Sequence, residues 1–452
     1  MIAAPALDHS SWGVVIRSLT NDVTLYTLNP RKLLMPASTM KIVTLAAAAE
    51  RLRWDFSYET RLVGAGTLGA GVLHGDLVVV GTGDPSIDDW DGAASRLFQG
   101  WGEQLKAAGV RTVTGRVVGD GSAFDDKPFG AGWAWDDLSA SYAAGVGALQ
   151  FNENTAQVSV MPGSTAGDPA SVTIAPSGTS LVVRNMLTTS RSEVPPSIDV
   201  RRLPGSTTLE VRGSVPAGSA RAIRNISVDN PTLYFVAALR DALIADGIDI
   251  RGPAVDIDEV ADPPSRDRAT LLLTHRSPPL STLAETMIKL SQNLYAETLL
   301  KSVGASTGAG TAEAGRSAAA SVVREWGVGP ADLVIADGSG LSRYNLATPE
   351  AIVTILTHVD RDDRLRAPFE AALPVAGRDG TLALRMRGTA AEGNARAKTG
   401  SFTNARGLSG YVRTADDEPL VFCIIVNNFG TSPEVVEQTM DAIVVRLASF
   451  RH

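Results

Sequence analysis

The feature that most constrains this chain is a serine and a lysine near its start, in Pro36-Ala37-Ser38-Thr39-Met40-Lys41, just before an apolar run at 42–52. Ser38 and Lys41 are three residues apart, so on a helix they share one face. A serine hydroxyl needs an adjacent base to act as a nucleophile, and a lysine is such a base when burial or a second cation lowers its pKa. The pair equally fits a helix N-cap followed by a solvated lysine, which implies no chemistry.

Two later motifs favour the chemical interpretation. Ser291-Gln292-Asn293 lies in an amphipathic run at 283–300 that predicts one long helix, and Lys398-Thr399-Gly400-Ser401 opens a strand-like run that continues to residue 412. S-x-x-K, then S-x-N, then K-T-G is the chain order of a class of active-site serine enzymes, and the three together are far more specific than any one. Gln292 stands where the strictest form of the middle motif has an aspartate.

The spacing of the motifs predicts the domain organisation. More than half of the 452 residues lie between Ser38 and Ser291, so the intervening chain is expected to be an insertion into one catalytic domain. The amino-acid composition changes near residue 54 and resembles that of the first segment again from about residue 270. The segment 155–219 is strand-like with almost no helical periodicity. We therefore expect a multi-domain α/β (α+β) protein. Its parts are a catalytic domain at 1–53 and 270–452, an inserted α/β domain at 54–154 and 220–269, and a small all-β domain at 155–219 nested in the insertion.

Several elements outside the motifs can also be predicted. Helices are expected at 93–108 and at 231–247, the second capped by Asp229 or Asn230. The C-terminal run at 435–450 is amphipathic and is expected to pack as a helix on the preceding strand. A strand ending in a turn is expected at 334–340, and the Gly/Ala/Thr-rich stretch at 304–315 predicts a mobile loop.

Composition and motif searches exclude several function classes. The net charge is −8 and no basic block is present, which argues against nucleic-acid binding. No metal-ligand spacing such as H-E-x-x-H or C-x-x-C occurs, and none of the five histidines neighbours a G-x-S-x-G elbow. We therefore expect no metal, no cofactor and no Ser-His-Asp triad. The single cysteine, Cys423, lies in an apolar strand-like run and is expected to be core.

Sequence features bear on the compartment only indirectly. No apolar run reaches the length of a transmembrane helix. The first residues lack the basic and apolar regions of a secretory signal. The expectation is either a cytoplasmic protein or a chain whose signal has been removed.

The three motifs suggest a separate catalytic role for each of their residues at one site. Ser38 is expected to attack a carbonyl and form an acyl-enzyme, with Lys41 taking its proton. A nearby Lys398 ammonium would lower the pKa of Lys41 by like-charge repulsion. Ser291 is the expected proton relay to the leaving amine. Asn293 carries an amide able to bond both Lys41 and a substrate oxygen.

The third motif suits a substrate carboxylate. Lys398, Thr399 and Ser401 supply a cation and two hydroxyls, and Gly400 leaves room for close backbone approach. The backbone N–H groups of Ser38 and Ser401 are the expected oxyanion hole.

On these motifs the chain resembles the class C, low-molecular-mass penicillin-binding D-alanyl-D-alanine carboxypeptidases, the penicillin-binding protein 4 type of peptidase family S13. The resemblance covers nearly the whole length. It is also carried by stretches outside the motifs: Gly81-Thr82-Gly83-Asp84-Pro85, Trp135-Asp136-Asp137, His275-Arg276-Ser277-Pro278-Pro279-Leu280, Ala336-Asp337-Gly338-Ser339-Gly340-Leu341-Ser342-Arg343, 405–412 and Val426-Asn427-Asn428.

The resemblance implies a fold and an activity. The fold is a serine β-lactamase/transpeptidase-like domain, an antiparallel sheet covered by helices, with a two-part insertion. The activity is hydrolysis of the terminal D-Ala-D-Ala bond of peptidoglycan stem peptides, in some members with endopeptidase action on crosslinks, and with acylation of Ser38 by β-lactam antibiotics. The family also implies a periplasmic, extracellular or cell-envelope location, with peripheral association at most. An acidic residue of the insertion, Asp137 or its neighbour Asp136, would meet the substrate's distal amino group, and Phe402 would line a side-chain pocket.

Two alternatives remain open. The same three motifs occur in β-lactamases and esterases, which rapid turnover of a penicillin would reveal. The second alternative is a catalytically silent homologue that binds the cell wall. All six motif side chains are present, and a binding module does not need them, which argues against this alternative. They are Ser38, Lys41, Ser291, Asn293, Lys398 and Thr399.

Overall fold

The computed structural model describes residues 4–176, 181–203, 205–265 and 269–451. The chain forms two compact units. Unit 1 comprises Met1–Phe56, Gly130–Trp133 and Pro278–His452, and unit 2 comprises Ser57–Phe129 and Ala134–Ser277. The first and last parts of the sequence thus fold together, with the middle of the chain inserted between them.

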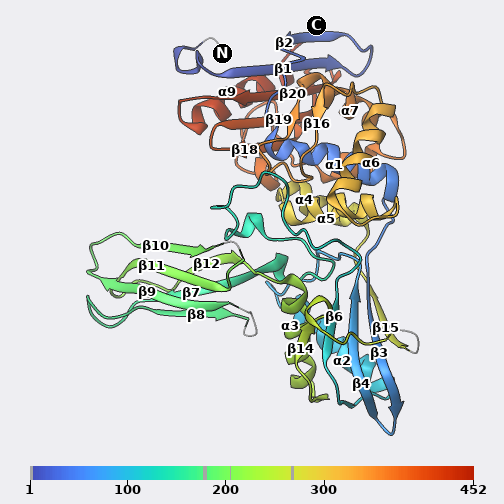
Figure 1. The fold of residues 1–452 in the computed structure, drawn as a ribbon. Helices are drawn as coiled ribbons and strands as arrows, with labels where there is room; N and C mark the ends of the chain where they lie inside the picture. The colour runs from blue at the N-terminus through green and yellow to red at the C-terminus, as the bar shows by residue number, and fades with distance from the viewer. Residues whose placement is uncertain (1–3, 177–180, 204, 266–268, 452) are drawn as a thin grey trace. The chain divides into compact units, whose positions relative to one another are not determined.

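Unit 1 is built on a five-stranded antiparallel sheet of order β18-β19-β20-β1-β2 (Figure 1). Its strands are β1 (Ser11–Ser18), β2 (Thr24–Leu28), β18 (Arg396–Phe402), β19 (Ala405–Arg413) and β20 (Pro419–Asn427). The central strand β20 is apolar from Pro419 to Val426 because helices cover both of its faces. Phe422 and Ile424 share a core with Met440 of α9. On the other face, the hydroxyl of Tyr411 in β19 donates to the carbonyl of Leu356 in α7.

The helices of unit 1 come from both ends of the chain. They are α1 (Met40–Leu52), α4 (Leu280–Lys289), α5 (Asn293–Ala305), α6 (Ala312–Glu325), α7 (Pro349–Arg361), α8 (Arg366–Ala372) and α9 (Pro433–Ala448). A two-stranded sheet of β16 (Leu333–Val334) and β17 (Leu346–Ala347) completes the unit. Helix α1 is flanked by α4, α5, α6 and α7, which buries ten of its residues. The prediction of an antiparallel sheet covered by helices is therefore confirmed.

Three local predictions in unit 1 are wrong. The helix expected at 283–300 is two helices, because Ser291 has φ 61°, a left-handed conformation that no α-helix accommodates. The strand expected at 334–340 is limited to β16, and a hydrogen-bonded turn follows it. Half of the loop expected at 304–315 is helical, since α5 ends at Ala305 and α6 starts at Ala312, where the Thr311 hydroxyl accepts from the Ala314 N–H.

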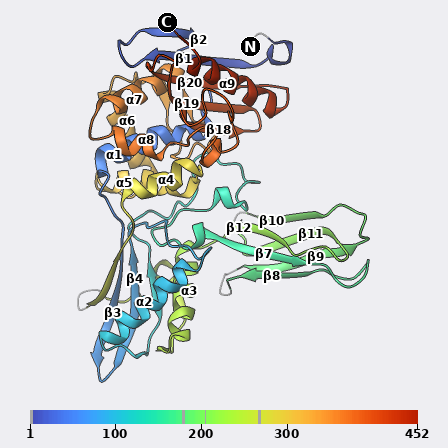
Figure 2. The same ribbon diagram turned by 180° about the vertical axis from the view of Figure 1, so that it is seen from behind.

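Unit 2 contains a seven-stranded sheet of order β13-β5-β4-β3-β15, with β6 pairing β4 and β14. The strands are β3 (Glu59–Gly69), β4 (Val72–Gly81), β5 (Thr112–Val113), β6 (Val117–Asp120), β13 (Asp249–Ile250), β14 (Ala254–Asp256) and β15 (Thr270–Arg276). Helices α2 (Ala93–Ala107) and α3 (Pro231–Ala245) lie side by side on it (Figure 2). Asn230 caps α3 as predicted, its side chain accepting from the Leu233 N–H at 2.8 Å. Trp101 of α2 and Phe235 of α3 fill the core.

Two three-stranded sheets form the remainder of unit 2. Their orders are β10-β11-β9 and β12-β7-β8. The strands are β7 (Thr155–Met161), β8 (Ser171–Ala175), β9 (Val182–Ser190), β10 (Ser197–Arg202), β11 (Thr208–Pro216) and β12 (Ala222–Ser227). The strand at Thr270–Arg276, which the sequence analysis assigned to the catalytic domain, pairs with β3 in unit 2. The three-part division of the chain stays a prediction.

Candidate active site

Ser38 lies in a short 3₁₀ turn, Ala37–Thr39, that leads directly into α1. The turn is tight: Ala37 has φ 49°, and the Thr39 hydroxyl donates to the Pro36 carbonyl at 2.6 Å. Ser38 is not the cap of α1, because Thr39 occupies the N-cap position without a side-chain cap bond. Lys41 is completely buried. The alternative of a capping serine and a solvated lysine is therefore wrong.

Two glycines make room for this turn. A Cβ on Gly340 would lie 2.0 Å from the Ala37 carbonyl oxygen, and one on Gly400 would lie 2.5 Å from the Pro36 carbonyl oxygen. Gly340 also has φ 83°, which disfavours any side chain. Gly400 of the K-T-G strand and Gly340 of the loop at 337–342 thus both lie close to the backbone of the Ser38 turn.

The Lys41 ammonium connects three segments of the chain. Its Nζ donates to Ser38 Oγ at 3.2 Å, to Asn293 Oδ1 at 2.6 Å and to the Ser339 carbonyl at 2.6 Å. Burial lowers the pKa of Lys41 to about 7, against opposing effects of Asp337 and Glu297. Repulsion from Lys398, the cause that the sequence predicts, is not the main contribution to this shift. Removal of the ammonium from water is instead the main cause.

Ser291 and Lys398 form a second hydrogen-bonded pair. Ser291 sits in the break between α4 and α5, where its Oγ accepts from Lys398 Nζ at 2.9 Å. Lys398 is fully buried in β18, and it also donates to the Thr399 carbonyl at 2.8 Å. Burial, followed by repulsion from Lys41, holds the pKa of Lys398 well below its usual value. Gln292 caps α5 by accepting from the Leu294 N–H, so it has a structural role of its own.

The remaining predicted residues differ in where the structure places them. The Thr399 hydroxyl donates to that of Thr381 at 2.7 Å. Ser401 is exposed near the end of β18. The guanidinium of Arg343 lies over the Phe402 ring, 5.2 Å from its centroid. Asp137 belongs to unit 2, where its carboxylate accepts from the Tyr142 hydroxyl at 2.5 Å. It takes no part in the hydrogen bonds of the Ser38 network.

Comparisons with known proteins place the chain in a family. The model of the D-Ala-D-Ala carboxypeptidase 3 (S13) family matches residues 1–450. The chain belongs to this family. Among curated relatives, it is 35% identical over 461 residues to a D-alanyl-D-alanine carboxypeptidase of Actinomadura sp., covering 99% of this chain and 82% of the relative. It is 26% identical to the D-alanyl-D-alanine carboxypeptidase DacB of Haemophilus influenzae, covering 93% and 86%.

A solved structure supports the same assignment. Penicillin binding protein 4 (dacB) from Haemophilus influenzae superposes with a TM-score of 0.85 at 25% identity, covering 98% of this chain and 97% of that one. That protein has also been solved in complex with a β-lactam, and in that form it superposes with a TM-score of 0.80 at 24% identity. As a member of the family, this S13 carboxypeptidase is a serine-type hydrolase.

The S13 site contains two buried acids that the sequence reasoning missed. Glu297 is 4% exposed and accepts from the N–H groups of Gly338 and Ser339, at 3.0 and 2.7 Å. Burial and the neighbouring Asp337 raise its pKa to about 7. Because the Ser339 carbonyl accepts from Lys41, Glu297 fixes an acceptor of the lysine. The sequence feature that points to Glu297 is its position four residues after Asn293, which places both side chains on the same helix face.

Asp337 holds the other side of this loop. Its carboxylate accepts from the N–H groups of Gly340 and Ser342, at 2.8 and 2.6 Å, and from the Asn345 amide at 2.6 Å. The indole N–H of Trp133 donates to it at 2.8 Å. From the sequence, Asp337 is identified only as one residue of a stretch that resembles the family. Its buried carboxylate sets the conformation of the loop that packs on the Ser38 turn.

The described ranges hold no group of three His, Cys, Asp or Glu side chains placed to bind a metal ion. Within those ranges no helix has both the length and the apolar character needed to cross a membrane.

Proposed function

We propose that Ser38 is the nucleophile with which this carboxypeptidase cleaves the terminal D-Ala-D-Ala bond of peptidoglycan stem peptides. The observation that carries the proposal is the contact between Lys41 Nζ and Ser38 Oγ at 3.2 Å, made by a lysine whose pKa burial lowers to about 7. About half of the Lys41 side chains are then neutral at pH 7 and can accept a proton. An ordinary serine beside a charged ammonium would have no base.

The first half of the reaction follows from these contacts. Neutral Lys41 takes the Ser38 proton as Oγ attacks the carbonyl carbon of the penultimate residue, giving a tetrahedral oxyanion. The N–H groups of Ser38 and Ser401 are the proposed donors to this oxyanion. When the intermediate collapses, the peptide C–N bond breaks, D-alanine leaves, and its nitrogen receives the proton that Lys41 had taken up, so that Lys41 is neutral again. Ser291 is the proposed relay for that proton, because its hydroxyl already accepts from Lys398.

The second half returns the enzyme to its starting state. A water molecule loses a proton to the same base and attacks the acyl carbon, and the ester bond to Ser38 Oγ breaks as the serine regains a proton. The shortened peptide leaves with a free carboxylate. A β-lactam forms the same kind of ester when its ring opens, which makes a penicillin a probe of the acylation step alone.

Substrate recognition is assigned to the edge strand and its neighbours. Lys398, Thr399 and Ser401 are proposed to hold the C-terminal carboxylate, with Gly400 allowing close approach. Asn293, which already fixes Lys41 through its Oδ1, carries an NH₂ group that suits a substrate carbonyl. For the stem-peptide side chain we propose Phe402, and for its distal amino group Asp137. Such a substrate lies outside the cytoplasmic membrane, and we propose that location for the enzyme.

Release of D-alanine from a pentapeptide ending in D-Ala-D-Ala tests the proposal. Ser38→Ala should lower the rate at least about 10³-fold, because the nucleophile is lost. Ser321→Ala is the matched control in unit 1, since the Ser321 hydroxyl donates to the neighbouring Glu325 on the surface of helix α6, and it should leave the rate unchanged. Retained activity in Ser38→Ala, or no D-alanine from the folded wild-type protein, would reject it.

Mass spectrometry after penicillin treatment separates the alternatives. A long-lived adduct on Ser38 is expected for a carboxypeptidase. An adduct that forms and disappears within the dead time, with stoichiometric excess of hydrolysed penicillin, would indicate a β-lactamase. A folded protein with no adduct would indicate a silent binding homologue. Crosslinked muropeptide in place of the pentapeptide tests endopeptidase cleavage, which uses the same acylation with a larger leaving group.

A further inference from the structure

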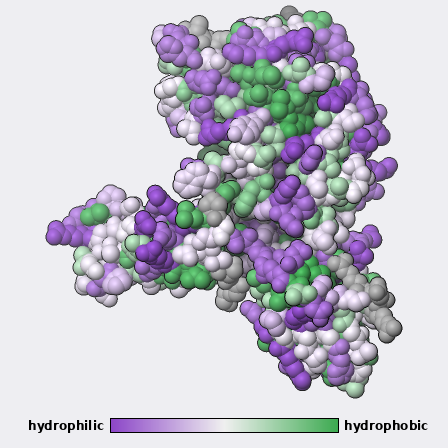
Figure 3. Space-filling view, viewed as in Figure 1, coloured by the Kyte–Doolittle hydropathy of each residue, from purple (hydrophilic) through white to green (hydrophobic). Residues whose placement is uncertain are grey.

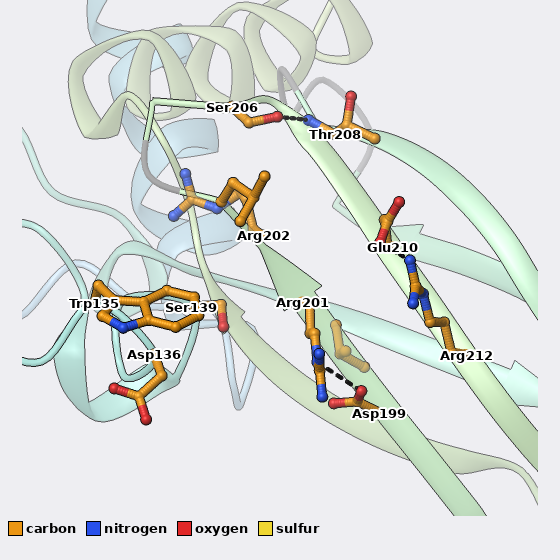
Figure 4. A pocket seen from close by; sticks show the side chains of 12 residues that line it. Trp135, Asp136, Ser139, Asp199, Arg201, Arg202, Ser206, Thr208, Glu210 and Arg212 are labelled. Atoms are coloured by element: carbon orange, nitrogen blue, oxygen red, sulfur yellow. Dashed lines mark hydrogen bonds and ion pairs between the residues drawn. The ribbon is translucent and has the colours of Figure 1, made fainter.

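Unit 2 contains a pocket of about 450 Å³ whose lining includes none of the residues of the Ser38 hydrogen-bond network. Its floor is one face of the β10–β11 pair, where Asp199 lies opposite Arg212 and Arg201 lies opposite Glu210 (Figure 4). Residues two apart on a strand share a face, so these four charged side chains stand together. The visible surface of the part that carries these strands mixes hydrophilic and hydrophobic residues (Figure 3).

The charges in the pocket balance. Three carboxylates, those of Asp136, Asp199 and Glu210, stand with three guanidinium groups, those of Arg201, Arg202 and Arg212. Arg201 pairs with Asp199 at 2.7 Å, and Arg212 pairs with Glu210. A lining with no net charge does not select an anion or a cation, but it presents many donors and acceptors at fixed positions.

One wall of the pocket is rigid. The Arg202 side chain is 4% exposed, and its Nη1 and Nη2 donate to Asp229 at 2.6 Å and to the Ser227 hydroxyl at 2.9 Å. The Ser227 hydroxyl in turn donates to the Leu138 carbonyl, and the Ser227 N–H donates to the Ser139 carbonyl at 3.1 Å. The loop that carries Trp135 is thereby fixed to strand β12. A site built in advance loses less entropy when a ligand binds.

An exposed aromatic ring forms another part of the lining. Trp135 is 66% exposed although a large apolar side chain is normally covered, and Figure 4 shows its ring beside Ser139 at the pocket. The hydroxyls of Ser206 and Thr208 line the far rim. A flat apolar ring in the same pocket as paired charges and hydroxyls matches a sugar ring, which has one apolar C–H face and a rim of hydroxyl groups.

We propose that this pocket binds the sugar rings of an uncharged glycan, with one ring stacked on Trp135 and its hydroxyls bonded to the charged pairs of β10 and β11. Given the proposed function, on which this step rests, the glycan is the N-acetylated strand that carries the stem peptides. Binding the strand would hold many stem peptides near the enzyme, so the pocket acts through local substrate concentration. It makes no contribution to cleavage of a free peptide.

Isothermal titration of the full chain with N,N′,N″-triacetylchitotriose tests the proposal. Saturable binding is expected in the wild type, and Trp135→Ala should weaken it at least about tenfold because the stacking surface is lost. Trp90→Ala is the matched control, since Trp90 is also exposed, at 45%, and belongs to unit 2 but does not line the pocket. It should change the affinity less than about twofold.

A second variant separates this proposal from the proposed function. Arg201→Leu removes one charged pair from an exposed position, so folding is not at risk, and it should weaken saccharide binding several-fold. Its release of D-alanine from a soluble pentapeptide should equal that of the wild type. No saturable binding, equal effects of Trp135→Ala and Trp90→Ala, or binding of polyphosphate in place of the saccharide would overturn the glycan site. Failure to cleave the pentapeptide with binding intact would overturn only the proposed function.

Discussion

The burial of Lys41 predicts the pH at which acylation of Ser38 fails. Its pKa is lowered from 10.5 to about 7, mainly because the ammonium is removed from water. At pH 7 about half of the enzyme then carries a neutral lysine, whereas a pKa of 10.5 would leave about one molecule in 3,000. The structure therefore supplies a factor of about 10³ in competent enzyme at neutral pH.

The sign of the dependence follows from the role of the base. Only neutral Lys41 can accept the Ser38 proton, so acid removes activity and alkali restores it. The acylation rate should be nearly constant above pH 8 and should fall about tenfold for each pH unit below about 6. The measurement is the second-order rate constant for a penicillin, followed by mass or by loss of absorbance from pH 5 to 9. This constant reports the ionisation of the free enzyme.

Glu297 provides a specific perturbation of this profile. Its negative charge raises the pKa of Lys41, so Glu297→Gln should move the midpoint of the profile to lower pH. The glutamine oxygen can still accept from the Ser339 N–H, which preserves the loop. Glu297 itself has a pKa of about 7, so the wild-type midpoint belongs to both groups and the variant should show a simpler, single titration.

The control for Glu297→Gln is Glu313→Gln, which removes an exposed charge from the first turn of α6 and should not move the midpoint. A wild-type midpoint near 10 would refute the account of Lys41 as the base. So would a midpoint that rises, or stays fixed, in Glu297→Gln while the protein remains folded.

Three further substitutions test separate parts of the structure. Ser291→Ala removes the acceptor of Lys398 Nζ and should slow D-alanine release about 10²–10⁴-fold, measured at saturating peptide, with little change in the unfolding temperature. Gly340→Ala places a methyl group 2.0 Å from the Ala37 carbonyl oxygen and should cost about 1–3 kcal/mol and slow penicillin acylation; an acylation rate equal to wild type would contradict the close packing of the two loops. Trp101→Ala empties the core of unit 2, where the side chain is 1% exposed and packs 5.3 Å from the Phe98 ring, and should cost about 3–5 kcal/mol in urea unfolding.

Local features of this protein could be predicted because they depend on nearby residues alone. The three-residue spacing of Ser38 and Lys41 puts both side chains on one turn whatever the rest of the chain does. Asn230 before Pro231 marks a helix start by its own hydrogen bond. The unbroken apolar run from Leu420 to Val426 likewise indicates a strand covered on both faces, as β20 is at the centre of its sheet. The motif order gave the family, since few enzymes share all three.

The tertiary structure determines the backbone conformation, burial and hydrogen-bond partners of those residues. Ser291 was expected within a helix, yet packing against Lys398 places it in a break with a left-handed backbone, which no periodicity predicts. The base strength of Lys41 comes from its complete burial, and its position is fixed by Glu297 through a loop about forty residues further along the chain. Periodicity specifies which face of an element is apolar, but the partners of a buried charge are set only when distant segments pack together. Those partners and the loss of water determine its pKa, and so the chemistry at Ser38.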